Sequence, residues 1–534
     1  MHHYAEIHWD CNPPRIDIPR QYNACCEFID RNLDEGRREK IALIDDMGSY
    51  TYGQLAERVD RASNALLELG VRAESKVLLC LTDTVDFPTV FWAVLRLGAI
   101  AIPVNTMLTS KDYDYILNDS RATALVLSED FFDTFRPILG SQIHLRTVVV
   151  SGKNNHGQIS LSEVMNAAST RFVPAQTTAD DIAFWLYTSG STGTPKGSIH
   201  LHRDLVVTAA LYGVGVLGMG SDDVGFSAAK MFFAYGLGNS MSFPFYVGAT
   251  AVVTARKPSP EVIMALIEHH SPSIFFAVPT LYGALLTNPA SHRANGCAKL
   301  RLCVSAGEAL PARIGENWEE RFEVPILDGL GSTEMLHIFL SNRPDDVRYG
   351  STGKPVAGYE LKLLTDDGAK AAAGELGELW VKGDSTAVSY WNQREKSLNT
   401  FNGRWTRTGD KYSVDDEGYY YFHGRTDEML KVGGQWVSPF EVESALTTHP
   451  QVLEAAVVAR ADDDGLIKPM AYLVVRQTGQ DSQELSDEIK IYVKEKLAPF
   501  KYPRWIQFVA DLPRTATGKV QRFKLREQNT TDLS

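Results

Sequence analysis

Ile182-Ala-Phe-Trp-Leu-Tyr187 runs directly into Thr188-Ser-Gly-Ser-Thr-Gly-Thr-Pro-Lys-Gly-Ser198. The first segment is typical of a buried strand. In the second, glycines let the backbone approach a ligand, successive N–H groups and hydroxyls can bind phosphate oxygens, and Lys196 supplies a cation. It is not a Walker A loop, because Lys196 follows Pro195 and not a glycine. The pattern indicates a phosphate-binding loop, with a flexible surface linker as the alternative.

Around this segment, short apolar runs alternate with helical patterns. Thr51-x-x-Gln54 has the form of a capping box at the start of an amphipathic helix, and a second helical pattern covers Phe87–Leu97. Such alternation is typical of parallel strands that are covered on both faces. We therefore expect an α/β domain over residues 1–426. Its apolar runs are Val77–Leu81, Ala99–Val104, Ala124–Leu127, Ala249–Thr254, Ile274–Val278 and Leu302–Ser305.

The last hundred residues follow a different pattern. Ser438-Pro-Phe-Glu441 combines an N-cap serine with proline at the first helical position and glutamate at the third. A charged helix is predicted with apolar positions from Leu485 to Leu497. We predict a compact α+β domain over residues 427–534. Its strand candidates are Leu453–Ala459, Ala471–Val475 and Trp505–Val509.

Composition narrows the classes of function. With 53 Lys+Arg against 66 Asp+Glu, the formal charge is −13, which disfavours partners such as nucleic acids and anionic membranes. The longest apolar stretch, Phe91–Val104, is shorter than the ~20 residues of a membrane span, and the N-terminus has no signal-peptide pattern. We expect a cytoplasmic protein. The six cysteines show no C-x-x-C pairing, so we expect neither disulfides nor a structural metal.

Two further motifs carry carboxylates in turns. Gly329-Leu-Gly-Ser-Thr-Glu334 places Glu334 where it could bind Mg²⁺, which takes one or two carboxylates together with phosphate oxygens. The hydroxyl of Thr333 could contact a phosphate. Asp410, in Thr408-Gly-Asp410, could accept two hydrogen bonds. Each carboxylate could instead be a solvated turn residue.

These motifs together resemble the acyl-adenylate-forming superfamily, which includes acyl-CoA synthetases, nonribosomal-peptide adenylation domains and luciferases. The resemblance covers nearly the whole chain. Within the superfamily, the sequence is most similar to benzoate-CoA ligases, especially in the segments Lys230–Asn239 and Leu336–Phe339. It implies a large N-terminal domain with a small β-barrel-like part and a small mobile C-terminal domain. In chain order, the matching motifs after the loop are Ser305–Ala309, Gly329–Glu334, Thr408–Asp410, Gly424–Asp427 and Pro513–Lys519.

The resemblance implies an ATP site. Lys196 and Thr333 would act on the phosphates, Glu334 would hold Mg²⁺, and Asp410 with Arg425 would bind the ribose hydroxyls. The other nucleotide-binding residues that it implies are Thr188, Ser189, Gly190, Ser191, Thr192, Gly193, Ser305, Ala306, Gly307, Glu308, Asp328 and Gly329.

The same resemblance assigns roles near the C-terminus. Lys519 would be the lysine of the adenylation step, where a cation offsets charge as one anion attacks another. Asp427 would be the hinge that turns the small domain, and coenzyme A would pass beside Gly433 and Gly434. A surface lysine and a simple glycine turn are the alternatives.

The acyl pocket is expected to have planar apolar walls that suit an aromatic ring, with glycines leaving room at its edge. An aromatic cluster in a plain core is the alternative. Amino-acid-activating relatives carry an aspartate near Phe233–Tyr235, and its absence argues against an amino acid. The expected pocket residues are Phe233, Ala234, Tyr235, Gly236, Leu330, Gly331, His337 and Ile338.

The sequence thus predicts an ATP-dependent aryl-CoA synthetase that converts benzoate, ATP and CoA into benzoyl-CoA, AMP and diphosphate. Hydroxybenzoate or aminobenzoate as the substrate, and an enzyme that loads a carrier protein in trans, are the alternatives. A regulatory nucleotide-binding protein is disfavoured because Lys196, Glu334, Asp410 and Lys519 are all present. Association into a homodimer stays open.

Overall fold

The computed structural model describes residues 4–188, 195–288, 291, 297–432, 435–462, 466–476, 482–514 and 520–531. The chain divides into two compact units. The first holds residues 1–361 and 381–407, and the second holds residues 362–380 and 408–534. This division differs from the expected boundary at residue 427, because the second unit also takes in strands that precede it. The expected boundary stays a prediction.

In the described part of the first unit, seven strands form a sheet in the order β11-β10-β6-β5-β7-β8-β9. The pairs from β10–β6 to β8–β9 are parallel, whereas β10 and β11 are antiparallel. Apolar side chains of α4 (Ser110–Ser120) and α5 (Phe132–Leu139) pack on one face. The strands are β5 (Lys76–Cys80), β6 (Ile100–Pro103), β7 (Ala124–Ser128), β8 (Thr147–Ser151), β9 (Ile159–Ser160), β10 (Ile182–Thr188) and β11 (Lys196–Leu201).

A second sheet of nine described strands has the order β18-β17-β16-β15-β14-β12-β13-β3-β4. It is parallel from β16 to β3 and antiparallel at both margins. Helices α10 (Pro260–His270), α11 (Pro279–Thr287) and α12 (Ala312–Phe322) form a core with it. The strands are β3 (Ile41–Asp45), β4 (Gly48–Thr51), β12 (Val224–Ser227), β13 (Thr250–Val252), β14 (Ile274–Ala277), β15 (Leu302–Ala306), β16 (Ile326–Gly331), β17 (Ile338–Ser341) and β18 (Lys354–Pro355).

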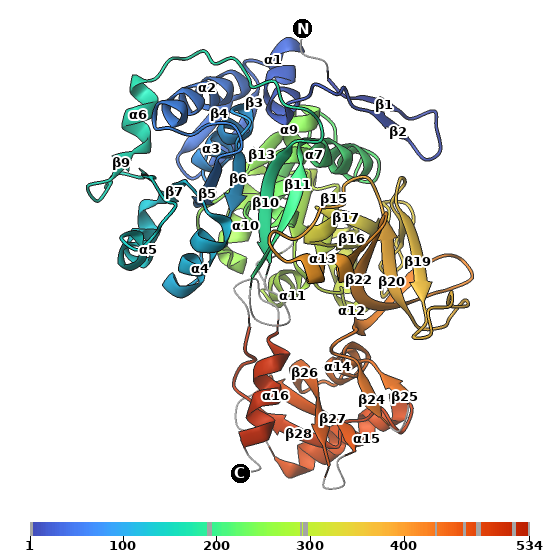
Figure 1. Cartoon of the computed structure of the whole chain (residues 1–534). Coiled ribbons are helices and arrows are strands. Elements are labelled where there is room, and N and C mark those ends of the chain that lie inside the picture. The colour runs from blue at the N-terminus through green and yellow to red at the C-terminus, as the bar shows by residue number, and fades with distance from the viewer. Residues whose placement is uncertain are drawn as a thin grey trace. The chain divides into compact units, whose positions relative to one another are not determined.

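Other helices and a hairpin complete the first unit (Figure 1). The hairpin of β1 (Glu6–His8) and β2 (Arg15–Asp17) extends from its margin. Longer helices are α2 (Tyr52–Glu68), α3 (Asp86–Arg96), α6 (Leu161–Ala167), α7 (His202–Thr208) and α13 (Arg394–Thr400). Shorter helical segments are η1 (Cys26–Asp30), α1 (Arg31–Asp34), η2 (Glu129–Phe131), η3 (Ala209–Val214), α8 (Ala234–Leu237), η4 (Gly238–Ser242), α9 (Phe243–Val247), η5 (Cys297–Lys299) and η6 (Thr333–Met335).

A small sheet has the order β19-β20-β22-β21, with β23 beside β22. No strand pairing among the described residues closes it into a barrel, which is consistent with the small barrel-like part that was expected. Its strands are β19 (Glu360–Leu364), β20 (Gly377–Lys382), β21 (Phe401–Asn402), β22 (Trp405–Val414) and β23 (Tyr420–Arg425).

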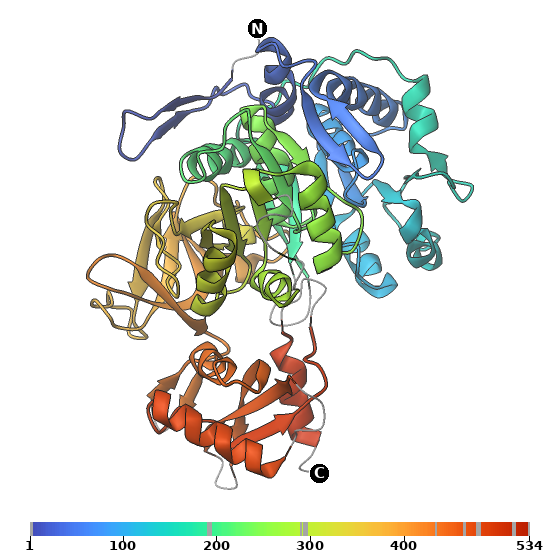
Figure 2. The ribbon, with the colours of Figure 1, turned by 180° about the vertical axis from the view of Figure 1, so that it is seen from behind.

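The C-terminal part of the second unit is an α+β layer structure. Its sheet of β26 (Val452–Ala461), β27 (Ile467–Val475) and β28 (Trp505–Phe508) packs on α14 (Pro439–Thr447) and α15 (Gln483–Lys496) through one face. The other face contacts α16 (Arg522–Thr531) through Leu525. Figures 1 and 2, seen from opposite sides, show α16 and α15 on these two faces. A short hairpin joins β24 (Leu430–Val432) and β25 (Gln435–Val437).

Local sequence signals placed several of these elements correctly. The side chain of Thr51 accepts from the backbone of Gln54 and the side chain of Gln54 accepts from the backbone of Thr51, so the predicted capping box at α2 is confirmed. At α14, Ser438 Oγ accepts from the backbone N–H of Glu441 at 3.0 Å. None of the described helices is both long and apolar enough to cross a membrane.

Candidate active site

The predicted phosphate loop joins two antiparallel strands, which brings its ends together. Thr188 at the end of β10 is the register partner of Lys196 at the start of β11. Thr188 Oγ1 is buried without a hydrogen-bond partner among the described residues. The loop residues predicted to bind phosphate, Ser189, Gly190, Ser191, Thr192 and Gly193, lie outside the described residues.

Lys196 and Glu334 lie together in a cluster that is completed by Tyr390. Lys196 Nζ is 3.2 Å from Glu334 Oε1 and 2.6 Å from Tyr390 Oη, and that hydroxyl donates to Glu334 Oε1 at 2.6 Å. Burial alone would raise the pKa of Glu334, but the Lys196 cation and the Tyr390 hydrogen bond outweigh burial and lower that pKa. Glu334 is therefore an anion at neutral pH.

Tyr390 was not predicted from the sequence. It lies 56 residues from Glu334, and its neighbours Ser389 and Trp391 belong to no recognised motif. The ammonium of Lys196 also lies 4.0 Å from the centre of the Tyr390 ring, within the range of a cation–π contact. Only the folded chain brings Tyr390 next to Lys196 and Glu334, so the spacing of these residues in the sequence does not predict the contact.

The donor chemistry of Glu334 fits a magnesium ion. Its side chain is 16% exposed and ionised, and Mg²⁺ usually takes one or two carboxylates and completes its coordination with water and phosphate oxygens. No group of three metal-ligating side chains occurs among the described residues. A bound ion would therefore depend on ATP oxygens for most of its ligands.

Glu334 is carried by the turn η6, which several contacts hold in place. Ser332 Oγ caps it by accepting from the backbone N–H of Met335 at 3.3 Å. Leu336, the next residue, has φ +66° and ψ −39°, a conformation that non-glycine residues keep only where their surroundings impose it. The turn's three carbonyl oxygens are bound by His200 Nε2 at Thr333, by the Ala387 N–H at Glu334 and by Ser385 Oγ at Met335.

The predicted nucleotide residues on the parallel sheet lie at its carboxyl edge, where ligands of α/β sheets bind. Ser305 of β15 pairs in register with Asp328 of β16, and Ala306 pairs with Gly329. Ser305 Oγ and Asp328 Oδ1 are buried without hydrogen-bond partners among the described residues. Burial raises the pKa of Asp328 to about 8. These orphaned polar atoms fit a polar ligand. The residues that follow β15 are Gly307, with φ +92°, and the partly exposed Glu308.

In the predicted acyl pocket, His337 and Tyr235 are in contact. Their ring centres are 5.6 Å apart, and His337 Nε2 lies 3.3 Å from the backbone oxygen of Tyr235 and 3.2 Å from Asn239 Oδ1. Burial lowers the pKa of His337 to about 3, so its ring is neutral. A carbonyl only accepts, so Nε2 carries the proton. Nδ1 is then a buried acceptor without a partner among the described residues.

Two of the predicted pocket glycines lie against neighbouring backbone. A Cβ on Gly236 would lie 2.1 Å from the Lys230 carbonyl oxygen, and a Cβ on Gly331 would lie 2.7 Å from the His337 carbonyl oxygen. Both glycines therefore make room for neighbouring backbone. That they also leave room at the edge of a ligand stays a prediction. Of the other predicted pocket residues, Ile338 is buried, whereas Phe233, Ala234, Tyr235 and Leu330 are partly exposed.

In the second unit, the predicted ribose ligands are brought together. Asp410 and Arg425 are register partners on β22 and β23, and their side chains form an ion pair at 2.9 Å. Asp427 lies within this unit, with Oδ1 3.8 Å from Arg425 Nε, and its role as a hinge stays a prediction. The predicted residues Gly433, Gly434 and Lys519 lie outside the described residues.

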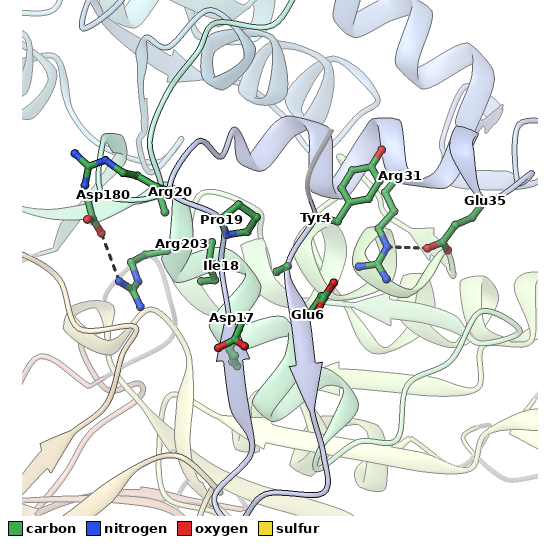
Figure 3. Close-up of a pocket in the computed structure, with 13 residues that line it drawn as sticks. Tyr4, Glu6, Asp17, Ile18, Pro19, Arg20, Arg31, Glu35, Asp180 and Arg203 are labelled. Atoms are coloured by element: carbon green, nitrogen blue, oxygen red, sulfur yellow. Dashed lines mark hydrogen bonds and ion pairs between the residues drawn. The ribbon is translucent and has the colours of Figure 1, made fainter. Parts of the chain in front are cut away.

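A separate cavity of about 940 Å³ lies beside the β1–β2 hairpin and contains none of the predicted site residues. Figure 3 shows its main ion pairs, Arg31 with Glu35 and Arg203 with Asp180. Arginine and carboxylate groups balance closely around it, so it does not have the excess positive charge of a phosphate site. Its charged lining residues are Glu6, Asp17, Arg20, Arg31, Glu35, Asp180 and Arg203.

Comparison with known proteins agrees with this geometry. The model of the AMP-binding enzyme family matches residues 30–391, and that of the AMP-binding enzyme C-terminal domain matches residues 441–519. The chain is 53% identical to a benzoate--CoA ligase of Thauera aromatica, over 96% of this chain and 97% of the relative. It is 48% identical to a 4-hydroxybenzoate--CoA/benzoate--CoA ligase of Rhodopseudomonas palustris, over 95% and 94%. The crystal structure of the anthranilate CoA ligase AuaEII with anthranoyl-AMP matches with a TM-score of 0.92 and 43% identity, over 97% and 99%.

Proposed function

Because the chain belongs to the AMP-binding enzyme family, we propose that it is an AMP-forming aryl-CoA synthetase with benzoate as its preferred acid. In the first step, a carboxylate oxygen of the acid attacks the α-phosphorus of ATP. The bond from that phosphorus to the bridging oxygen breaks, and diphosphate leaves. In the second step, the sulfur of CoA attacks the acyl carbon, the thiol proton is lost, and AMP leaves with the oxygen that the acid supplied. The cytoplasm, which supplies ATP and CoA, is the proposed location.

The chain's own groups have separate tasks in this proposal. Lys196 neutralises phosphate charge and Glu334 holds Mg²⁺, which when bound neutralises charge on the ATP phosphates. Thr333 contacts a phosphate oxygen, Asp410 and Arg425 bind the ribose, and Lys519 offsets charge during the attack. Gly433 and Gly434 line the path of CoA after the small domain turns about Asp427.

The observation that carries the proposal is the hairpin of β16, η6 and β17. It runs from Ile326 to Ser341 and carries Asp328 and Glu334 together with His337 of the aromatic pocket. Gly331 before the turn pairs in register with Ile338 after it. One short hairpin therefore carries residues that we propose to bind the nucleotide together with a residue that we propose to bind the acid. A carboxylate held by the aromatic pocket would lie beside the phosphates that it must attack.

A second candidate is a synthetase for a substituted benzoate. The unpartnered acceptor Nδ1 of His337 would accept a hydrogen bond from a ring hydroxyl or amino group. A site built for such a bond rejects an acid that lacks it by about 10⁴–10⁵-fold, whereas an apolar pocket separates small substituents by only ~10–200-fold.

The test is kcat/KM for benzoate, 2-aminobenzoate, 4-hydroxybenzoate and hexanoate, measured by diphosphate release with saturating ATP and CoA. We expect benzoate to lead and hexanoate to be weakest. A lead of several orders of magnitude for either substituted acid would establish the second candidate. A hexanoate lead would refute the aromatic pocket. If diphosphate forms with benzoate but the thioester forms only on a carrier protein, the enzyme loads a carrier in trans.

A further inference from the structure

His200 is a fully buried histidine with both ring nitrogens in polar contacts. It lies on β11, on the same face as Lys196, because side chains alternate along a strand. Nδ1 is 2.9 Å from Asp204 Oδ2, and Nε2 is 2.7 Å from the backbone oxygen of Thr333. The ring also stacks on Phe184, with centres 5.2 Å apart and planes inclined by 16°. These contacts fix the position and the orientation of the ring.

The chemistry of the two partners assigns the protons of the His200 ring. A backbone carbonyl only accepts, so Nε2 is the donor to Thr333. A second proton must lie between Nδ1 and Asp204, because a bare nitrogen and a carboxylate would repel each other at 2.9 Å. The Leu201 N–H also donates to Asp204 Oδ2, at 3.0 Å. Asp204 therefore holds His200 in the form that donates to Thr333.

The carbonyl that His200 binds belongs to the turn that carries Glu334. Without the His200 donor, the Thr333 oxygen would keep the Leu336 N–H at 3.2 Å, a bond that lies within the turn and does not tie it to β11. The strained backbone of Leu336 needs such external ties. His200 thus ties the backbone of the turn that carries Glu334 to β11, in addition to the ion pair that Lys196 of the same strand makes with the Glu334 side chain.

We propose that His200, oriented by Asp204, is a positioning residue that sets the Thr333–Glu334 turn for binding of Mg-ATP. This inference rests on the proposed function. A binding group whose position is already fixed by its neighbours loses little conformational entropy when the ligand binds, and a small displacement of such a group weakens binding strongly. In this proposal, His200 and Asp204 act through the turn and do not themselves contact the nucleotide.

The test uses three variants of the full-length chain that separate the two ring contacts. The amide of His200→Gln can reach the position of Nε2, the amide of His200→Asn reaches only the position of Nδ1, and His200→Met reaches both without a donor. His202→Gln is the matched control, because His202 is also buried but accepts from the Ala24 N–H, away from the turn.

We expect the Kd of ATP with Mg²⁺, measured calorimetrically without any acid, to rise about 10–100-fold in the Met and Asn variants, because displacement of the turn should weaken the contact of the Glu334 carboxylate with Mg-ATP by about as much as loss of one hydrogen bond to a charged group. His200→Gln should stay within about threefold of the wild type, and the KM for benzoate should change little in all three. His202→Gln should lower the melting temperature and leave the Kd of ATP unchanged.

Two outcomes would overturn the inference. In one, Gln weakens ATP binding as much as Met, which would make the role one of packing. In the other, Asn and Met bind Mg-ATP like the wild type. If His200→Met melts below the assay temperature, His200→Asn decides alone, since it keeps the contact with Asp204. A wild type that binds Mg-ATP but activates no acid would refute the proposed function and leave this inference standing.

Discussion

Replacing Glu334 by glutamine tests the charge at the centre of the candidate site. The substitution keeps the shape and an acceptor for Tyr390, but it removes the partner of Lys196 at 3.2 Å. At an effective dielectric constant of about 20, that attraction is about 5 kcal/mol, most of which desolvation offsets. The side chains of Lys196 and Glu334 are both partly exposed, so we expect the substitution to lower the free energy of unfolding by about 1–3 kcal/mol.

The larger effect of Glu334→Gln should be on adenylate formation. Loss of the proposed Mg²⁺ ligand should slow that step about 10²–10³-fold and raise the Mg²⁺ concentration for half-maximal rate. The assays are ATP–diphosphate exchange over a Mg²⁺ titration, thioester formation from preformed benzoyl-adenylate, and denaturant unfolding. Glu360→Gln is the control, because its ion pair with Lys382 is exposed and should matter by less than about 0.5 kcal/mol. Exchange within tenfold of the wild type, with an unchanged Mg²⁺ requirement, would refute the assignment.

Three other predictions concern the remaining parts of the proposed mechanism. Lys519→Ala should cost ~3–4 kcal/mol in adenylate formation and less in capture by CoA; an equal loss with preformed adenylate would show that Lys519 serves both steps or is structural. Asp427→Pro should let adenylate accumulate, because proline fixes φ at the proposed hinge; normal thioester output from a variant with a normal melting curve would show that the pivot lies elsewhere. Because burial lowers the pKa of His337 to about 3, the ring stays neutral above that pH, and the kcat/KM ratio of benzoate to 2-aminobenzoate should be constant from pH 6 to 9; a change centred near 6.5 would show that His337 titrates at its ordinary pKa.

The sequence predicted those parts of the fold that depend on neighbouring residues. The caps at Thr51 and Ser438 are set by contacts three residues apart, so spacing reveals them. The parallel strands pair over long separations, but their burial makes each one a continuous apolar run that can be seen in the sequence. The sheet of β19–β23 and the hairpin of β1 and β2 were not placed, because their strands lack long apolar runs.

The candidate site was predicted where motifs carry its residues and missed where the fold alone brings residues together. Lys196 and Glu334 come from motifs, but Tyr390 between them does not. His200 meets Thr333 across 133 residues, a separation from which no spacing rule predicts contact. The close approach of Gly236 to the Lys230 backbone was likewise not predicted, since only the fold brings the two together.

In the proposed reaction, an acid is activated as its adenylate before transfer to CoA. The most direct measurement is mass spectrometry of the products from benzoate labelled with ¹⁸O in both carboxylate oxygens, incubated with ATP, Mg²⁺ and CoA. We expect benzoyl-CoA with one ¹⁸O and AMP with one ¹⁸O, because the attacking oxygen leaves with AMP. Label in inorganic phosphate, with ADP as the other product, would contradict it, because it would show attack on the γ-phosphorus through an acyl phosphate.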